Sequence, residues 1–166
     1  MEKYQKFISE KAKKKREFMG KMFFPRKPIL LLDLSMSKKR SSFKDLLEGL
    51  NAINLTTLVV ARNGKEEAKL GNIHYIPLEK VSQAHEAADF TVVFSGDLSK
   101  ARTVGCVPIS QLDGDSTVDY NPLQQKGNGF YFKNPTKWEV FASIVRALET
   151  YQFPYDWENL IREVLS

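Results

Sequence analysis

The 166-residue sequence contains one cysteine, two histidines and no apolar run approaching the ~18–20 residues that span a bilayer. Cys106 has no internal disulfide partner, as is typical of proteins in a reducing cytoplasm. His74 and His85 stand apart, so no His/Cys cluster predicts a metal site. The N-terminus is charged from Glu2 onward and does not resemble a secretory signal. These absences predict a cytoplasmic chain without a transmembrane segment, a metal or a bound cofactor.

Acidic residues are scarce only at the N-terminal end. Residues 1–27 carry eight Lys and two Arg against three Glu, a charge of +7, whereas the whole chain carries +5. The body is therefore nearly neutral. It lacks the array of basic side chains interleaved with aromatics that nucleic-acid-binding domains present. We expect no nucleic-acid partner.

Apolar residues recur at helical spacing between residues 4 and 23, in a stripe interrupted by Lys11 and Lys15. The pattern predicts a basic amphipathic helix over residues 1–24, packed on or flanking a domain of residues 25–166, with its lysines in water. The alternative is that residues 4–23 bind a protein partner, a second copy of the chain or, peripherally, an anionic membrane.

Apolar runs and helical periodicities alternate along the body. Strands are predicted over residues 29–34, 55–61, 73–77, 90–94, 107–110 and 130–132, and helices over residues 43–50, 81–88, 98–104, 136–151 and from 154 onward. Continuous aliphatic strands are typical of parallel sheets covered on both faces. The alternation predicts an α/β fold, a Rossmann-like parallel sheet with helices on both faces. Trp138 and Trp157 lie on the apolar faces of their helices and are expected to be at least half buried.

Two strand-to-helix turns carry the residues best suited to a ligand, because open α/β sheets bind ligands beyond the carboxyl ends of their strands. Lys38, Lys39 and Arg40 stand among hydroxyl side chains before a helix, an arrangement that favours an anion. The turn lacks the glycines of a P-loop, and a solvated basic turn is the alternative. Ser95 and Gly96 form the second turn.

An acidic cluster of Asp113, Asp115 and Asp119 follows the predicted strand at 107–110. Its spacing is not that of a calcium-binding loop. Turn formation is the favoured use of these residues.

Six segments of the chain carry a further pattern. They are EKAKKKREFMGKMFFPRKPILLLDL, AHEAADFTVVFS (84–95), VGCVPIS (104–110), DGDSTVDY (113–120), GNGFYF (127–132) and the Ala-Leu…Tyr…Trp tail (147–157). In this order they resemble the C-terminal, nucleotide-sugar-binding half of the glycogen and starch synthases, which are two-domain GT-B glycosyltransferases. The resemblance implies a single GT-B C-terminal-type domain.

The first departure from the family lies after the first strand of the body. The family's strand ends in S-R-L-x-x-Q-K-G, whose Arg and Lys neutralise the nucleotide diphosphate. Here Asp33 stands at the Arg position and Lys38 at the Lys position. An acid at that position would repel a diphosphate. We expect Asp33 at the carboxyl end of a central strand, paired with the turn at Lys38–Arg40.

Two further departures concern the donor site and the cleft. The family's R-F-E-P-C-G-L element has no counterpart after Ser95. The D-T-V motif keeps Thr117 but has Ser116 for its Asp. The family's N-terminal half, with its acceptor site, is not among these 166 residues, and such transferases react in the cleft between two domains.

These departures predict a glycogen/starch-synthase-like domain that has lost glycosyl transfer, a pseudoenzyme without catalytic residues that acts as a binding or scaffold module. One alternative is half of a split ADP/UDP-sugar hexosyltransferase. Another is a sensor that binds a nucleotide or sugar phosphate weakly, and an unrelated flavodoxin-like domain is the last. The vestigial pocket would comprise Lys38, Lys39, Arg40, Ser95, Gly96 and Thr117.

Overall fold

The computed structural model describes residues 2–34, 43–61, 71–94, 96–111 and 118–166. In these residues six parallel strands form one sheet in the order β3-β2-β1-β4-β5-β6. The strands are β1 (Ile29–Asp33), β2 (Thr56–Ala61), β3 (Ile73–Pro77), β4 (Phe90–Val93), β5 (Val107–Gln111) and β6 (Phe130–Phe132). The predicted Rossmann-like parallel sheet is confirmed, with strand ends within one residue of their predicted positions.

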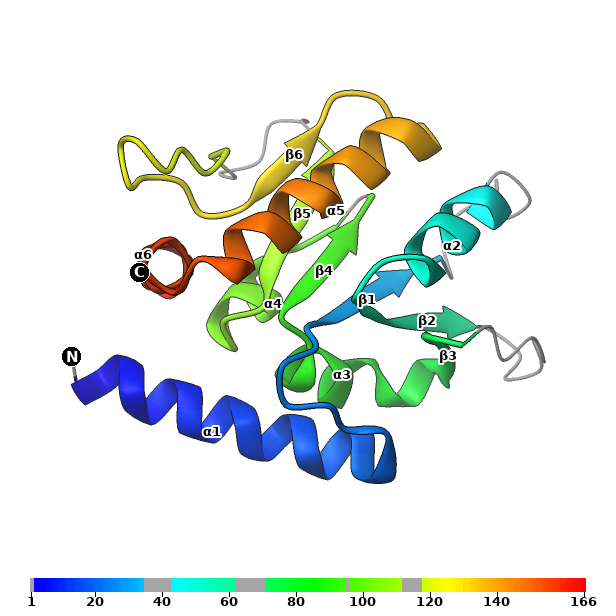
Figure 1. Ribbon diagram of the computed structural model, residues 1–166, viewed down its shortest axis with the longest axis horizontal. Coiled ribbons are helices and arrows are strands. Elements are labelled where there is room, and N and C mark those ends of the chain that lie inside the picture. The colour runs from blue at the N-terminus through cyan, green and yellow to red at the C-terminus, as the bar shows by residue number, and fades with distance from the viewer. Residues whose placement is uncertain (1, 35–42, 62–70, 95, 112–117) are drawn as a thin grey trace.

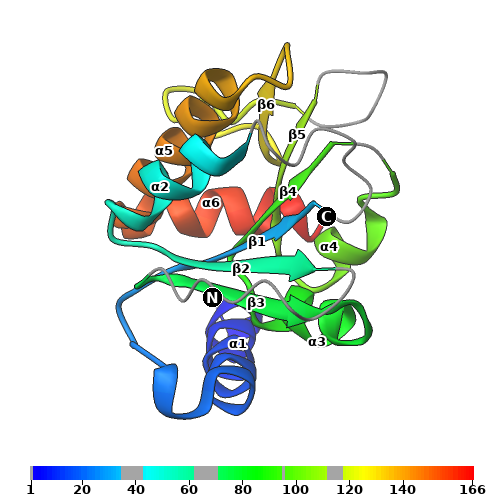
Figure 2. The ribbon, with the colours of Figure 1, turned by 90° about the vertical axis from the view of Figure 1, so that its right-hand side faces the viewer.

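Helices cover both faces of the sheet (Figures 1 and 2). They are α1 (Glu2–Met19), η1 (Gly20–Met22), α2 (Lys44–Asn51), η3 (Leu78–Lys80), α3 (Val81–Ala87), α4 (Ser99–Thr103), α5 (Lys137–Gln152) and α6 (Pro154–Val164). Helices α2, α5 and α6 lie on one face, and α3 and α4 on the other. Helix α1 runs beneath the molecule in Figure 1, near the amino ends of the strands.

The alternation of side chains along β1 divides the interior into two cores. Leu30 and Leu32 point into a core shared with α2, α5 and α6, whereas Ile29 and Leu31 point into a core shared with α1, α3 and α4. Successive residues of a strand face opposite sides of the sheet. A strand covered on both faces must therefore be apolar at every position, which accounts for the run Ile29–Leu32.

The prediction that the lysines of α1 all lie in water is wrong. Lys13 and Lys14 are exposed, but Lys11 and Lys15 keep only 6% and 8% of their surface. These two lysines belong to the stripe that they were expected to interrupt, because they find partners in the body of the domain. The helix also ends earlier than predicted, at Met19, where Gly20 begins a 3-10 turn.

The two tryptophans differ in their environments. Trp157 of α6 is 8% exposed, as predicted, and meets the Phe90 ring edge-on at a centroid distance of 5.3 Å. The prediction for Trp138 is wrong, because 73% of its surface is exposed. The buried face of α5 includes Val140 and Ile144. Trp138 precedes Val140 by two residues, about 200° around the helix, and so faces outward.

None of the helices in the described residues combines the length and the apolar character that crossing a bilayer requires.

Candidate functional site

The strand order of the sheet reverses between β1 and β4, which are paired neighbours. The chain winds outward from β1 to β2 and β3 on one side, and from β4 to β5 and β6 on the other. In open α/β sheets the ligand crevice lies at such a switch point, beyond the carboxyl ends of the strands. The described residues nearest this edge are Asp33 and Leu34 after β1, and Phe94 and Gly96 after β4.

Most of the predicted ligand pocket falls outside the described residues. This applies to Lys38, Lys39 and Arg40, and also to Ser95 and Thr117. Their assignment to a phosphate site stays a prediction.

Gly96 is the one predicted pocket residue that the structure describes. Its φ is +122°, a conformation that side-chain-bearing residues rarely adopt, and no heavy atom lies within 4 Å of the position a Cβ would take. The glycine is therefore required by the turn and not by close packing, and it leaves open space at the carboxyl edge of β4.

Asp33 is the last residue of β1, which lies between β2 and β4, and the prediction that it ends a central strand is confirmed. The predicted salt bridge to Lys38–Arg40 lies outside the described residues. The Asp33 carboxylate favours protonation of His85, but burial of the imidazole outweighs it and lowers the pKa of His85. The side chain that ends β1 at the switch point is thus an acid, where the family resemblance implies an arginine.

A second carboxylate lies after β4. Asp97 Oδ1 accepts a 2.8 Å hydrogen bond from the backbone N of Ser99, the first residue of α4, and Oδ2 accepts one of 2.7 Å from Ser99 Oγ. These bonds hold the pKa of Asp97 below its usual value. The backbone N–H that begins α4 is thus occupied by the chain's own acid. The Asp-Leu-Ser sequence is a side-chain turn signal that could have predicted this contact.

Three aromatic rings pack behind this edge. Phe94 lies 5.1 Å from Phe43 and 5.7 Å from Phe132, measured between ring centroids. They join the start of α2 to the ends of β4 and β6. Periodicity predicted each ring in its element, but not this contact between three distant segments.

The acidic segment before β6 contains one described member of the predicted cluster, Asp119. Its Oδ1 accepts a 3.1 Å hydrogen bond from the N of Tyr131, and its carboxylate pairs with Arg146 of α5. Asp119 therefore joins the turn to β6 and α5, a structural role in line with the predicted use in turn formation. Asp113 and Asp115 lie outside the described residues.

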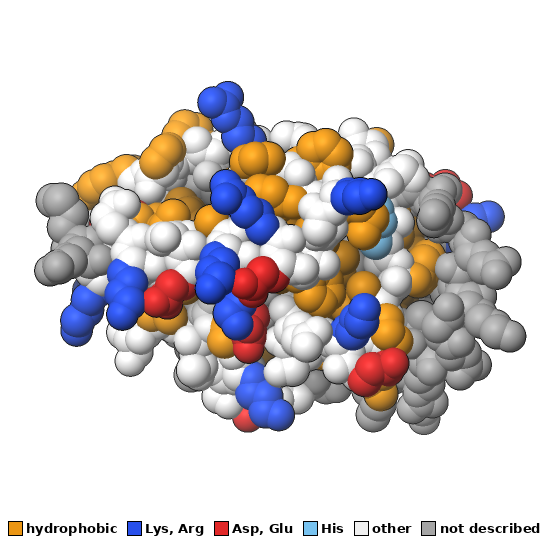
Figure 3. Space-filling view, turned by 90° about the horizontal axis from the view of Figure 1, so that it is seen from below, with side chains coloured by type: hydrophobic (Ala, Val, Ile, Leu, Met, Phe, Trp, Pro, Cys, Tyr) orange, Lys and Arg blue, Asp and Glu red, His pale blue; other side chains and the backbone are white. Residues whose placement is uncertain are grey.

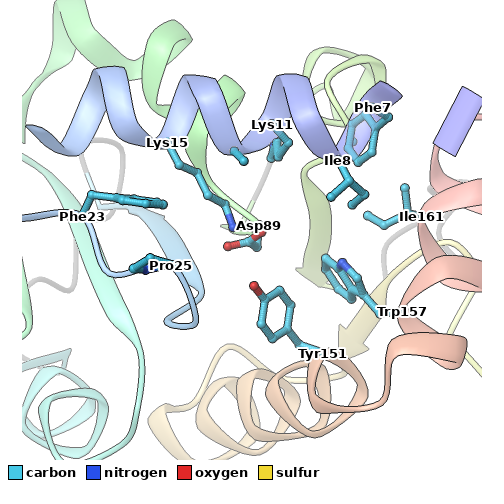
Figure 4. A pocket seen from close by; sticks show the side chains of 12 residues that line it. Phe7, Ile8, Lys11, Lys15, Phe23, Pro25, Asp89, Tyr151, Trp157 and Ile161 are labelled. Atoms are coloured by element: carbon cyan, nitrogen blue, oxygen red, sulfur yellow. Dashed lines mark ion pairs between the residues drawn. The ribbon is translucent and has the colours of Figure 1, made fainter. Parts of the chain in front are cut away.

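A cavity of about 140 Å³ lies between α1, α6 and the end of α5, near the amino ends of the strands (Figure 4). Phe7, Ile8, Trp157 and Ile161 give it apolar walls. Lys11, Lys15, Asp89 and Tyr151 contribute its charged and polar side chains.

Asp89 is at the centre of this polar cluster. Its Oδ1 lies 2.6 Å from Lys15 Nζ, and its Oδ2 accepts a 2.8 Å hydrogen bond from the N of Ile29. Burial alone would lower the pKa of Lys15, but Asp89 and Tyr151 outweigh it, and the pKa is raised. The ammonium is therefore charged at neutral pH, and the pair ties α1 to the starts of β1 and β4.

Among the described residues, no carboxylate lies within ion-pair distance of Lys11. Its Nζ donates to the carbonyl oxygens of Val104 and His85, at 3.1 and 3.4 Å. Burial is the largest influence and lowers its pKa. The two backbone carbonyls fix the middle of α1 against the loop before β5 and the end of α3.

Cys106 is fully buried, and burial raises the pKa of its thiol to about 12. The thiolate form that a nucleophile or metal ligand needs is therefore suppressed. No three His, Cys, Asp or Glu side chains gather into a metal-binding cluster within the part of the chain that the structure describes. Cys106 is a core residue.

Sequence comparison relates the chain to glycogen synthases. Glycogen synthase 1 of Synechocystis is 33% identical over 63 residues, which are 36% of this chain and 13% of that protein. Glycogen synthase of Geobacillus thermodenitrificans is 34% identical over 64 residues, 37% of this chain and 13% of that protein. A comparison with models of protein families finds none that matches.

Comparison of folds extends the likeness over nearly the whole chain. The catalytic domain of starch synthase IV from Arabidopsis thaliana, bound to ADP and acarbose, superimposes with a TM-score of 0.69 at 17% identity. The match covers 96% of this chain and 39% of that one. The chain is therefore similar to glycogen synthases over part of its sequence and to a starch synthase in its fold. Its fold is that of one half of a GT-B glycosyltransferase, as the sequence motifs predicted.

The glycogen/starch-synthase-like domain covers only a part of each of these proteins. The aligned segments are about an eighth of the length of the curated glycogen synthases, at 13% of each. The comparisons therefore support the resemblance to these synthases and the fold of the chain. Its activity and ligand have to be inferred from its own residues.

Proposed function

We propose that this domain is a non-catalytic binding module that has lost glycosyl transfer. The observation that carries the proposal is Asp33 at the carboxyl end of the central strand β1. Transfer from a nucleotide sugar develops negative charge on the departing diphosphate, and catalysis requires fixed positive charge or hydrogen-bond donors there. A carboxylate at this position opposes both binding and departure of the diphosphate.

Asp97 supports the same conclusion from the other side of the switch point. A helix N-terminus that receives a phosphate offers it free backbone N–H groups. Here the N–H of Ser99 donates to Asp97, only two residues earlier in the chain. A phosphate at that position would displace a carboxylate and meet its charge.

A second candidate is a sensor that binds a nucleotide or sugar phosphate without reaction. The open space beside Gly96 favours it, because a ligand could approach the backbone there. Lys38, Lys39 and Arg40 would supply the positive charge in this proposal. The starch synthase IV structure holds ADP, and the solved structure of HepE from Anabaena is in complex with UDP. HepE superimposes with a TM-score of 0.63 at 14% identity, over 95% of this chain and 49% of its own.

The proposal is tested by a transfer assay. The full chain is incubated with radiolabelled ADP-glucose or UDP-glucose and an α-glucan primer, and label in the glucan and free glucose are both counted. We expect neither product above the protein-free blank. Turnover of either donor by the chain alone would overturn the non-catalytic proposal. Turnover that appears only with a second polypeptide would instead support a split transferase.

A further inference from the structure

The segment between α1 and β1 forms a surface that the nucleotide-sugar edge does not involve. We call Lys21, Met22, Phe24, Arg26 and Lys27 the turn surface. These residues line one side of an open groove of about 840 Å³, whose other wall includes Asn54, Thr56, Asn72 and His74. The groove lies at the starts of β2 and β3, so it is at the opposite end of the sheet from the switch point.

Two large apolar side chains of the turn surface are exposed. Phe24 keeps 60% and Met22 47% of its surface. Single exposed apolar residues are ordinary, but these two lie within three residues of each other. In Figure 2 the turn that carries them projects from the molecule at lower left. Both side chains therefore reach solvent at the rim of the molecule while also lining the groove.

The charge of the groove is of one sign. Lys21, Arg26 and Lys27 all line it, and none of its described lining residues is acidic. On α1, by contrast, Lys6 and Lys13 lie beside the carboxylates of Glu10 and Glu17. Figure 3 shows the underside of the molecule, where hydrophobic side chains lie between Lys and Arg side chains.

Asn72, in the wall opposite the turn surface, is held by hydrogen bonds. The Asn72 N donates a 2.9 Å hydrogen bond to Asn51 Oδ1, and its side-chain amide donates to the Asn51 carbonyl oxygen at 3.3 Å. Lys27 Nζ donates to Asn72 Oδ1 and lies 5.7 Å from the centroid of the Phe24 ring. Lys27 therefore links the Phe24 ring to Asn72 on the opposite wall of the groove.

We propose that the turn surface docks on an anionic lipid bilayer. Phe24 and Met22 enter the headgroup region, and Lys21, Arg26 and Lys27 pair with lipid phosphates. Projecting apolar side chains among cations suit a membrane interface. The centre of a protein–protein interface is instead depleted of charged residues, whereas Lys21, Arg26 and Lys27 all line this groove. The inference is independent of the proposed loss of transfer, because the two surfaces share no residue.

The test is co-flotation of the full chain with vesicles in 50 mM NaCl. One preparation is pure phosphatidylcholine, and the other contains 30% phosphatidylserine. We expect binding only to the second, and its loss at 500 mM NaCl, because salt screens the contribution of the cations. No binding to the anionic vesicles at 50 mM NaCl would overturn the proposal.

Three double variants locate the contact. Lys21→Gln/Arg26→Gln should weaken vesicle binding about fivefold per charge removed. Met22→Ser/Phe24→Ser keeps every charge and should weaken binding about tenfold or more, because it removes the inserting groups. The control, Lys6→Gln/Lys13→Gln, removes the same charge from exposed lysines of α1. It should change binding less than about twofold, because these charges are partnered and lie away from the turn.

The variants can also contradict the proposal. All the substituted side chains are exposed, so circular dichroism and the melting temperature should match those of the parent chain. If the folded serine variant binds as the parent does, the apolar residues do not insert. If the control variant loses as much vesicle binding as Lys21→Gln/Arg26→Gln does, the attraction depends on total positive charge and not on the turn surface. Heparin competing equally with all variants would then identify a polyanion site instead.

Discussion

Asp89 is the side chain on which the attachment of α1 depends most. It accepts from the N of Ile29 and pairs with the nearly buried Lys15. Removing one partner of a buried pair leaves the other charge without compensation. We expect Asp89→Asn to lower the free energy of unfolding by about 3–5 kcal/mol in urea titrations.

The exposed pair Lys6–Glu10 provides the control for this change. Exposed pairs are screened by water, so Glu10→Gln should change stability by less than about 1 kcal/mol. Equal effects of Asp89→Asn and Glu10→Gln would show that the buried pair does not anchor the helix.

Gly105 tests how closely α1 packs. Its φ is +61°, and an added Cβ would lie 2.4 Å from Cζ of Phe7. Gly105→Ala should therefore cost about 2–4 kcal/mol, because both backbone strain and overpacking contribute. Gly20→Ala, at φ +53° with no atom within 4 Å of the new Cβ, should cost only the backbone part, about 1 kcal/mol.

The contact with Phe7 can be separated from the backbone strain. Adding Phe7→Leu to Gly105→Ala should recover part of the loss in urea titrations, whereas the same change added to Gly20→Ala should recover none. Additive effects in both pairs would contradict the close packing of α1 on Gly105.

Cys106 should make stability depend on alkaline pH. Burial raises the pKa of its thiol to about 12 in the folded chain, so the folded state keeps a proton that the unfolded state loses above its ordinary pKa of 9.0. This contribution is fully present below pH 9 and declines as pH rises towards 12. Near its steepest the loss is about 1.4 kcal/mol per pH unit.

The difference in urea midpoint between the parent chain and Cys106→Ala isolates the contribution of this thiol, because the other groups that titrate at alkaline pH are common to both proteins. Urea midpoints measured from pH 8 to pH 10.5 should fall more steeply for the parent chain above pH 9. Parallel profiles would contradict the assignment of a buried, protonated thiol.

Single side chains show where sequence reasoning reaches its limit. Trp157 could be placed because its helix repeats an apolar spacing through Leu160 and Ile161. Lys11 and Lys15 could not, because their burial depends on acceptors 74 or more residues away in the chain. The spacing of apolar residues shows which face of a helix a residue occupies. It does not show whether a carboxylate or carbonyl from a distant part of the chain lies within hydrogen-bond distance of that residue.

Helix α5 begins with a cap whose parts come from one short stretch. Glu139 Oε2 accepts hydrogen bonds from the backbone N of Lys133 and Asn134, at 3.0 and 2.7 Å, while Thr136 Oγ1 accepts from the Glu139 N. Thr-x-x-Glu is the capping-box sequence, but only its Thr136 half forms here. The Glu139 carboxylate accepts from residues before Thr136, while the N of Thr136 donates to the Asn134 carbonyl oxygen.

The cap should contribute measurably to stability. Glu139→Ala should lower the free energy of unfolding by about 1–2 kcal/mol, because the N–H groups of the connection from β6 lose their acceptor. Glu149→Ala, at an exposed position on the same helix, is the control and should be near neutral. Equal effects of the two changes would mean that the cap does not hold the start of α5.

Most elements could be predicted because each has a signal of its own. The aliphatic runs predicted β1, β2 and β4, and the spacing around Val140 and Ile144 predicted α5. The C-terminal end of α1 was predicted less accurately, because the end of a helix depends on a local turn. Here the turn begins at Gly20, which has a positive φ. The order of the strands depends on which elements pack together, and the sequence analysis did not predict it.

At the scale of the whole molecule, the chain places two acids, Asp33 and Asp97, on either side of the switch point, and the motif resemblance implies an arginine at the first of these positions. Asp33 was identified from the motif and lies where predicted, because a strand end is fixed by its pairing. Among the described elements, three of the five strand pairings join strands that are not consecutive or that are separated by a helix. Position along the sequence alone therefore does not give the charge at their shared edge.

The charge at this edge can be reversed. Asp33→Arg restores the residue type of the family's motif and should make binding of UDP or ADP measurable by calorimetry, because the repulsion is replaced by attraction. Glu48→Arg, at an exposed position on α2, changes the net charge equally and should leave binding undetectable. Gain of binding in both variants would attribute the effect to overall charge.

The most direct measurement is the melting temperature of the unmodified chain with ADP, UDP, ADP-glucose, UDP-glucose and sugar phosphates. A ligand at about 100 times its dissociation constant would stabilise the fold by about 2.7 kcal/mol, a readily measured shift. We expect no change in the melting temperature with any of these nucleotides, nucleotide sugars or sugar phosphates. A clear shift that Lys38→Ala abolishes would contradict it and would show that the nucleotide site is intact.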